Sequence, residues 1–377
     1  MKVIVAPDAF KGSLTAEEAA VAMERGVKKV FPEAEIICLP VADGGEGTLE
    51  SLVSATNGRY KTFTVHDPLG RLIKARLGIL GDGETAVVEL AQASGITLLT
   101  DDELDLMKAS TYGTGELIRY ALDEGYRKLI VGLGGSATND GGTGLLEALG
   151  VRFLDCEGKL LKMSGYSLSH IDIIDVSQLD KRLKSTDILI ASDVENPLVG
   201  VSGATHIFGP QKGADAKQVE FLDAGMLHFA DETERLVGKR LHDVRGAGAA
   251  GGTAGALLAY CGARLESGIA VVLRAMDFVQ HLSSVDVLLT GEGKTDLQTL
   301  NGKALIGVAR LAAEHGIPVI VVSGAVEEVA REQLTEWFAG VYEVDDGRPL
   351  AELMANASEL LTRRTEEVFS LDFNFFL

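Results

Sequence analysis

The sequence predicts an α/β protein with more than one domain, and three observations support this class. Apolar runs of strand length alternate with amphipathic segments of helix length over much of the chain. Many of these apolar runs end in glycine-rich loops, and the chain contains 44 glycines. At 377 residues the chain is also too long for one ordinary hydrophobic core. We therefore expect two domains, at least one of them built on a parallel sheet.

The composition excludes several classes of protein. A formal net charge of −20 opposes binding to nucleic acid or to an anionic membrane. No apolar run reaches the length of a membrane span, and the first residues enter a strand instead of a signal peptide. The three cysteines, Cys38, Cys156 and Cys261, are far apart and odd in number, which argues against a disulfide framework or a zinc site. We expect a cytoplasmic location.

The chain begins with two strand–helix pairs. The apolar run 3–6 predicts a buried strand, and Thr15 with Glu18 forms a capping-box pattern that starts a helix. A second strand over 35–39 leads through a glycine-rich loop to a helix near 48–55. This alternation is typical of a parallel sheet covered by helices.

From residue 61 the pattern changes. Three segments, 62–65, 72–77 and 85–90, alternate like antiparallel strands joined by turns. From residue 285 the alternation of buried strands with helices returns, so residues 61 and 285 mark candidate domain boundaries. Beyond residue 285 we expect strands at 287–289, 317–322 and 341–344, and helices at 326–338 and 350–369.

The most glycine-rich segment is residues 132–144, here called the central loop. It follows an apolar strand at 129–131 and precedes a helix near 145–149. Glycines let backbone N–H groups approach an anion, and a helix N-terminus adds a partial positive charge. The central loop is therefore predicted to bind phosphate, the alternative being a tight turn without a ligand. The predicted phosphate-binding residues are Gly134, Gly135, Ser136, Ala137, Thr138 and Asn139.

The central loop differs from the best-known nucleotide motifs. It is not a Walker A loop, because the required lysine is missing. It contains Gly132-x-Gly134-x-x-Ala137, a loose dinucleotide fingerprint, and Asp155 follows at roughly the 20-residue distance of a ribose-binding acid. Residues 139–142, however, would interrupt the helix that should follow such a fingerprint directly.

Charged side chains stand in loops that follow predicted strands, where open α/β sheets place their ligands. Asp8 and Lys11 follow the first strand, and a loop salt bridge is the alternative use for them. Asp43 and Glu46 lie among glycines after the second strand. Two carboxylates in such a loop suit Mg²⁺, and helix capping is the alternative.

Three further charged residues are candidates for contact with a substrate. Arg71 lies in a predicted turn, where an arginine is able to clamp a small carboxylate or simply to face solvent. Lys212 stands just ahead of a predicted helix. Asp193 emerges from the buried strand 187–191 and is a candidate base or metal ligand, with Glu195 as its rival.

Seven motifs of this sequence together resemble one family, the bacterial glycerate kinases that act on D-glycerate. In chain order the motifs are Pro7-Asp-Ala-Phe-Lys-Gly-Ser13, Ala42-Asp-Gly-Gly-Glu-Gly-Thr48, Asp67-Pro-Leu-Gly-Arg71, Gly134-Gly-Ser-Ala-Thr-Asn-Asp-Gly-Gly142, Asp193-Val-Glu-Asn-Pro-Leu198, Phe208-Gly-Pro-Gln-Lys-Gly213 and Thr290-Gly-Glu-Gly-Lys-Thr-Asp296. They run through the whole chain, which makes the resemblance far more specific than a single glycine loop. One departure is Lys294, where arginine is expected, so the bidentate geometry is lost there.

The resemblance implies ATP-dependent phosphorylation of D-glycerate to 2-phosphoglycerate with Mg²⁺, 3-phosphoglycerate remaining open as the product. It also implies a Rossmann-like parallel-sheet domain, residues 1–60 plus 285–377, with a second mixed α/β domain, residues 61–284, inserted into it. The inserted domain carries the central loop, and the active site is expected in the cleft between the domains. The sequence is compatible with a homodimer.

Phosphoryl transfer requires cations and backbone donors around the phosphates, a metal ion, and an acceptor hydroxyl held in line. The predicted roles are catalysis for Asp193, Lys11 and Asp8, substrate binding for Arg71 and Lys212, and metal binding for Asp43, Glu46, Glu292 and Asp296. Two alternatives stay open at this point. One is an NAD-dependent dehydrogenase of a small hydroxy acid, and the other is a non-catalytic module that binds a small molecule.

Overall fold

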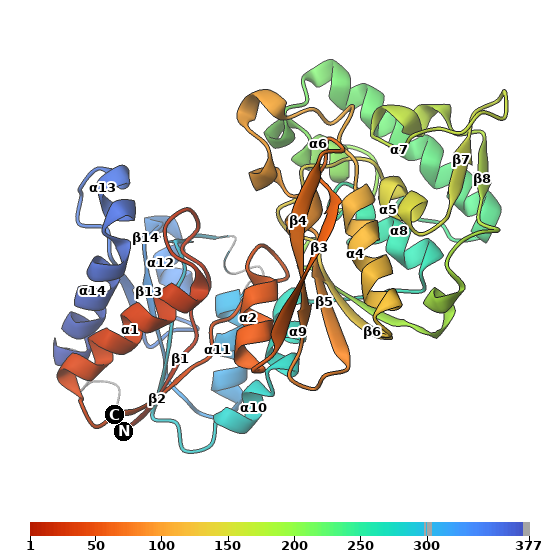
Figure 1. Ribbon diagram of the computed structural model, residues 1–377. Coiled ribbons are helices and arrows are strands. Elements are labelled where there is room, and N and C mark those ends of the chain that lie inside the picture. Colours follow the sequence, from red (N-terminus) through yellow and green to blue (C-terminus); the bar gives the residue numbers. More distant parts are fainter. Residues whose placement is uncertain (298, 300–303, 372–377) are drawn as a thin grey trace. The chain divides into compact units, whose positions relative to one another are not determined.

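The protein is an α/β protein of two compact units (Figure 1). This computed structural model describes residues 1–297, 299 and 304–371. Unit 1 comprises Met1–Asp43, Glu50–Thr56 and Gly268–Leu377, and unit 2 comprises Gly44–Leu49 and Asn57–Ser267. The predicted α/β class is confirmed, and the domain boundaries at residues 60/61 and 284/285 stay a prediction.

Unit 1 is built on a five-stranded sheet in the order β15-β13-β11-β1-β2, with every neighbouring pair parallel. The strands of unit 1 are β1 (Lys2–Val5), β2 (Glu35–Cys38), β11 (Val287–Thr290), β12 (Lys294–Thr295), β13 (Val319–Ser323), β14 (Ala325–Val326) and β15 (Gly340–Glu343). Its helices are α1 (Ala16–Val30), α9 (Gly268–Ala275), α10 (Phe278–His281), α11 (Ala304–Glu314), α12 (Glu328–Leu334), α13 (Leu350–Ala355) and α14 (Ala357–Leu371), together with the later part of α2 (Thr48–Ala55).

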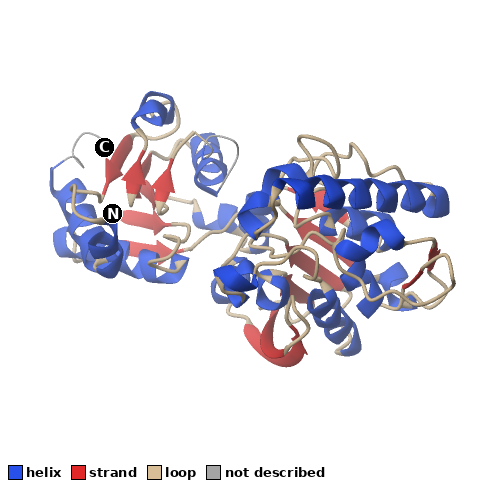
Figure 2. Cartoon of the chain, turned by 90° about the horizontal axis from the view of Figure 1, so that it is seen from above, coloured by secondary structure: helices blue, strands red, loops and turns tan. Residues whose placement is uncertain are grey.

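Helices cover both faces of this sheet (Figure 2). The predicted capping box is present, because the Thr15 side chain accepts from the Glu18 backbone N–H and starts α1. Close packing of α1 on α14 depends on Gly26, since a Cβ atom there would lie 2.6 Å from the carbonyl oxygen of Thr362. Helix α14 therefore contributes to the same hydrophobic core as β1.

Two predicted helices of unit 1 are wrong in extent. The single helix expected over 350–369 is broken, because the Asn356 side-chain amide donates to the carbonyl oxygen of Glu352 and ends α13. The helix expected over 326–338 is shortened to α12, since residues 325–326 pair with β12 as the strand β14.

Unit 2 is built on a six-stranded sheet in the order β10-β9-β6-β5-β4-β3. Its strands are β3 (Arg59–His66), β4 (Leu72–Ile79), β5 (Thr85–Glu89), β6 (Lys128–Gly132), β7 (Arg152–Leu154), β8 (Ile173–Asp175), β9 (Asp187–Ala191) and β10 (Arg264–Glu266). Its helices are α3 (Ala91–Ser94), α4 (Tyr112–Asp123), α5 (Thr143–Ala148), α6 (Ala204–Phe208), α7 (Ala216–Val237) and α8 (Thr253–Tyr260), with short 3₁₀ helices that include η4 (Lys181–Ser185) and η5 (Pro210–Lys212).

The six-stranded sheet is mixed, as predicted. The pairs β3–β4 and β4–β5 are antiparallel, and the pairs β5–β6, β6–β9 and β9–β10 are parallel. The inner strands are fully buried at most positions, because helices pack on both faces (Figure 2). The parallel strands therefore present their carboxyl ends at one common edge, and the loops beyond that edge carry most of the predicted site.

Candidate active site

The carboxyl edge of the six-stranded sheet gathers three loops of unit 2. Glu89, Gly132 and Ala191 are register partners at the last positions of β5, β6 and β9. The central loop follows Gly132, and residues 192–198 follow Ala191. Neighbouring strand ends thus bring together segments that are far apart in the sequence.

The third loop comprises residues 44–49 and is called the Glu46 loop. Its Gly44 carbonyl accepts from the backbone N–H of Gly134 at 3.1 Å. A Cβ atom at Gly134 would lie only 2.2 Å from the Cα atom of Gly45, and one at Gly44 would lie 2.3 Å from the carbonyl oxygen of Ala191. Glycine is required on both sides of this contact, which places the exposed Glu46 beside the central loop.

The central loop is held by backbone hydrogen bonds. The N–H of Ala137 donates to the carbonyl of Ser94, and the N–H of Ile96 donates to the carbonyl of Gly135. Gly135 adopts a φ of 70°, a left-handed conformation that favours glycine. The helix that follows, α5, has only six residues.

The buried ammonium group of Lys212 lies against the central loop. Its Nζ atom donates to Ser136 Oγ at 2.6 Å and to the Thr138 carbonyl at 2.9 Å. The side chain is 4% exposed, and burial lowers the pKa of Lys212 to about 7. Among the described residues Lys212 forms no ion pair, although the charge of the buried Asp140 attracts it, and the buried Thr138 hydroxyl has no hydrogen-bond partner. A buried cation beside an unpartnered donor suits an anionic ligand.

Asp140 supports this loop from within. Its fully buried carboxylate accepts from the backbone N–H and the hydroxyl of Thr111 at 2.8 Å, and from the N–H groups of Gly142 and Gly144. Burial raises the pKa of Asp140. Asp140 was not among the predicted site residues, although its sequence signal was visible, an acid placed before two glycines and a helix.

The predicted base and its rival are in different environments. Asp193 is half-buried and lies two residues beyond the end of β9. Glu195 is exposed and forms an ion pair with Arg245. The geometry therefore favours Asp193 for chemistry and gives Glu195 a role in an ion pair.

Arg71 is already engaged within its own turn. Its guanidinium donates to the buried carboxylate of Asp67 and to Glu103, and the hydrogen bond with Asp67 raises the pKa of Arg71. A bidentate grip on a substrate would require Arg71 to release one of these partners. Asn139 also has an internal partner, because its amide donates to the hydroxyl of Thr205 at 3.0 Å.

The remaining predicted site residues lie in unit 1, at the carboxyl edge of its parallel sheet. Asp8 N–H donates to the Gly291 carbonyl, which joins the loop after β1 to the loop after β11. The buried Glu292 accepts from the hydroxyls of Thr295 and Thr299 at 3.0 and 2.7 Å.

Three more of the predicted residues lie near or on these loops. Asp296 accepts from the backbone N–H of Thr299 at 3.3 Å, which caps a turn. Lys11 is exposed, and Asp43 is half-buried at the end of its unit 1 segment. Among the described residues no group of three or more His, Cys, Asp or Glu is arranged to hold a metal ion.

Comparison with known proteins identifies the family. The glycerate kinase family profile matches residues 3–372. The chain belongs to the glycerate kinase family. It is 47% identical to a glycerate kinase of Bacillus subtilis over 98% of this chain and 97% of the relative. It is 45% identical to the glycerate 2-kinase of Escherichia coli over 87% of this chain and 86% of the relative.

A solved structure has the same fold as this chain. A crystal structure from Salmonella typhimurium LT2 that carries the name glycerate kinase 2 superposes with a TM-score of 0.87 at 42% identity, and each chain is covered completely. As a member of the glycerate kinase family, the chain is an enzyme that uses a nucleotide. In the part of the chain that the structure describes, no helix is long and apolar enough to cross a membrane.

Membership of the glycerate kinase family also argues against the dinucleotide-binding alternative. A Rossmann fingerprint opens directly into a helix. Here α5 begins only at Thr143, well after the fingerprint glycines. Asp155 lies instead in an exposed turn, where its carboxylate accepts from the N–H groups of Glu157 and Lys159. The NAD-dependent dehydrogenase hypothesis is therefore wrong.

Proposed function

We propose that this enzyme transfers the γ-phosphoryl group of ATP to D-glycerate and forms 2-phosphoglycerate, with Mg²⁺ as its metal ion. The observation that carries the proposal is the buried Lys212 ammonium at the central loop, which contacts Ser136 Oγ and the Thr138 carbonyl but no carboxylate among the described residues. The name of the Escherichia coli relative, a glycerate 2-kinase, supports the 2-hydroxyl as acceptor. We also propose a cytoplasmic location.

In this proposal the central loop holds phosphate oxygens. The N–H groups of Gly134 and Ala137 already donate to Gly44 and Ser94, so the proposed backbone donors are the N–H groups of Gly135, Ser136, Thr138 and Asn139. The Thr138 hydroxyl is a further proposed donor. Lys212 supplies local positive charge for the phosphates, in a protein whose net charge of −20 would otherwise repel them. Asp193 accepts the proton of the acceptor hydroxyl as the phosphoryl group leaves the nucleotide.

Glu46 and Asp43 fit a Mg²⁺ ion by the chemistry of their donor atoms. Mg²⁺ binds through one or two carboxylates plus waters and phosphate oxygens, so a cluster of three protein ligands is not required. Both residues belong to one glycine-rich segment, and Glu46 is exposed beside the central loop. The metal would neutralise charge on the phosphates when bound. Glu292 and Asp296 remain proposed ligands, although both carboxylates already accept hydrogen bonds from threonines.

We further propose that the unit 1 residues Asp8 and Lys11 act on the same substrates. This follows the family resemblance, in which domains 1–60 plus 285–377 and 61–284 enclose the active site in a cleft. Arg71 stays a proposed substrate ligand. A homodimer also stays a proposal, to be measured by light scattering.

Phosphorus NMR tests the proposed reaction directly. The protein is incubated with ATP, Mg²⁺ and D-glycerate, and the spectrum is followed for loss of the ATP γ resonance and growth of a phosphomonoester resonance. A 2-phosphoglycerate resonance is the expected result. A 3-phosphoglycerate resonance would correct the acceptor hydroxyl. Membership of a kinase family excludes the non-catalytic binding module. Binding of both ligands without ATP consumption would therefore reject this pair of substrates.

A further inference from the structure

Glu89 was not among the predicted site residues, yet it lies at the centre of the carboxyl edge. It is the last residue of β5 and the register partner of Gly132, from which the central loop departs. Only 1% of Glu89 is exposed. A carboxylate is seldom buried this deeply unless the fold or the site uses its charge.

One use of this carboxylate is visible in the structure. Glu89 Oε2 accepts a hydrogen bond of 2.9 Å from the backbone N–H of Leu49. Leu49 is the second residue of α2 and is fully buried. The first N–H groups of a helix have no partner within the helix and carry partial positive charge, which a carboxylate satisfies well. Glu89 therefore fixes the end of the Glu46 loop to the sheet.

The other end of the Glu46 loop is fixed to the same edge. Gly44 accepts from the N–H of Gly134, and the Thr48 hydroxyl donates to the Gly45 carbonyl at 2.7 Å. The segment that follows Glu89 supports the central loop in turn, since Ser94 and Ile96 bond to Ala137 and Gly135. Both loops are therefore held by hydrogen bonds to the end of β5 and the segment that follows it.

We propose that Glu89 is a positioning residue, which holds the Glu46 loop against the central loop and so sets where the Glu46 carboxylate stands relative to bound phosphate. The role in catalysis rests on the proposed kinase function, but the role in holding the loop does not. The hydrogen bond at Leu49 transmits the effect, and Glu89 itself needs no contact with substrate.

Hydrogen exchange followed by mass spectrometry tests the proposal without reference to activity. In Glu89→Leu, which removes the acceptor at similar side-chain volume, exchange of amides in residues 44–49 should accelerate about tenfold or more, while β5 and β6 stay protected. Glu89→Gln keeps an acceptor oxygen and should restore much of the protection. Glu84→Leu is the matched control, because Glu84 is exposed beside β5 and pairs with Lys128.

A kinetic cycle then tests the consequence for the site. If Glu89 acts by placing Glu46, Glu46→Gln should cost much less in the Glu89→Leu background than in the wild type. Unchanged exchange over 44–49 in folded Glu89→Leu would overturn the proposal, and so would equal acceleration throughout unit 2. If Glu89→Leu does not fold, Glu89→Met, which also lacks the acceptor, is compared with Glu84→Met by the same criteria. Accelerated exchange in a protein whose wild type lacks kinase activity would reject the proposed function and keep the positioning role.

Discussion

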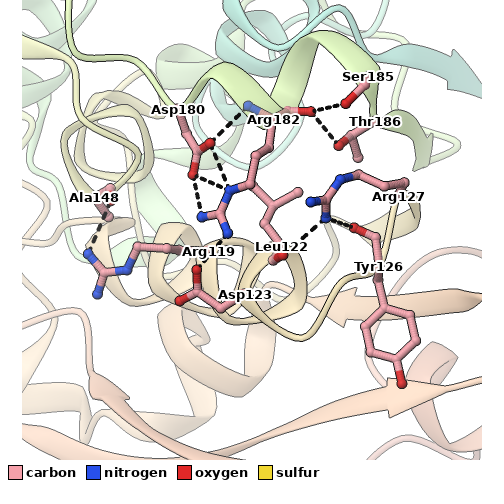
Figure 3. Close-up of polar contacts among 10 residues, drawn as sticks. All are labelled: Arg119, Leu122, Asp123, Tyr126, Arg127, Ala148, Asp180, Arg182, Ser185 and Thr186. Atoms are coloured by element: carbon pink, nitrogen blue, oxygen red, sulfur yellow. Dashed lines mark hydrogen bonds and ion pairs between the residues drawn. The ribbon is translucent and has the colours of Figure 1, made fainter.

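At the amino ends of β6 and β9 three arginines are paired with carboxylates and carbonyls, whereas at the carboxyl ends of the same strands a buried lysine meets only neutral oxygens. Figure 3 shows the amino-end cluster. Arg182 bridges Asp180 and Asp123 at 2.6 and 2.7 Å. Arg127 donates to the carbonyl of Leu122 in the last turn of α4 and to that of Tyr126, and Arg119 donates to the carbonyl of Ala148 at the end of α5. Each arginine thus neutralises a helix C-terminus or a carboxylate.

The carboxyl end has the opposite arrangement. Lys212 is buried, its hydrogen bonds end on a hydroxyl and a carbonyl, and its charge is desolvated. Desolvation of this ammonium outweighs the attraction of the buried Asp140, so the charge of Lys212 destabilises the folded protein. The comparison teaches that the arginines at the amino end complete the fold, whereas at the carboxyl end Lys212 forms no ion pair among the described residues and is the charge that we propose for a ligand.

The largest expected effect is a loss of kcat on substitution of Asp193, which substitution of Asp187 at the other end of β9 should not cause. Asp193 follows the carboxyl end of β9, and Asp187 begins β9 with an exposed ion pair to Arg264. Asp193→Asn should lower kcat for glycerate phosphorylation by about 10²–10⁴, since a general base is lost, with little change in Tm or nucleotide affinity. Asp187→Asn should leave kcat unchanged. An Asp193→Asn enzyme that keeps more than about a tenth of the wild-type kcat would end the assignment.

The second prediction compares two lysines that are five positions apart. Lys212→Met removes the buried ammonium and keeps most of its volume, so nucleotide affinity should fall roughly ten- to hundredfold, as for loss of a charged hydrogen bond. Tm should stay level or rise, because a desolvated charge is removed. Lys217→Met at an exposed position of α7 is the control and should change neither quantity. Calorimetry that shows equal affinities for both variants would remove Lys212 from the site.

The third prediction concerns pH and follows from the pKa of about 7 for Lys212, below its ordinary value of 10.5. The depressed pKa means that the unfolded chain binds the proton more tightly, so this group contributes instability below pH 7 that is relieved as pH rises toward 10.5. Anions bind the protonated form better, so nucleotide affinity should fall up to about tenfold per pH unit above pH 7. The slope should disappear in Lys212→Met, and an identical slope in that variant would assign the effect to another group.

The sequence predicted most of this fold because the patterns were local. The capping box at Thr15, the antiparallel segments after residue 61 and the buried strand before the central loop all follow from near neighbours. The broken final helix was missed because its end depends on one Asn356 side-chain bond, which competes with a favourable helical pattern.

The site was harder to predict, since its geometry depends on contacts between distant segments. The sequence indicated a glycine-rich loop and several charged residues but could not show that Lys212 contacts Ser136, 76 positions away. It gave no sign that Glu89 reaches the Leu49 N–H, because a glutamate at the end of a strand has no distinctive pattern. Arg71 was singled out although its guanidinium is occupied by Asp67 and Glu103. Which charge is free for a ligand is a property of the packed structure.

The fourth prediction uses two exposed glutamates of unit 2. Glu46→Gln should raise the Mg²⁺ concentration for half-maximal activity roughly fivefold, the equivalent of about 1 kcal/mol for an exposed charge interaction. KM for D-glycerate should change less. Glu84→Gln, which only breaks an exposed pair with Lys128, should leave the Mg²⁺ titration where it was. Matching titration curves for the wild type and Glu46→Gln would instead give the Glu46 loop a purely structural role.

The smallest effect is expected at the amino end of the sheet, and it falls on stability alone. Arg182 is about one-third exposed and joins η4 to the end of α4 through Asp123 (Figure 3). Solvent screens this pair, so Arg182→Met should cost only about 1 kcal/mol. For a unit of this size that is a fall in Tm of about 2–4 °C, measured by circular dichroism. Because no site residue is bonded to Arg182, kcat and KM should match the wild type at 25 °C. A fall in kcat with unchanged Tm would mean that the two ends of the sheet are coupled. The purely structural role of the arginines at the amino end would then be wrong.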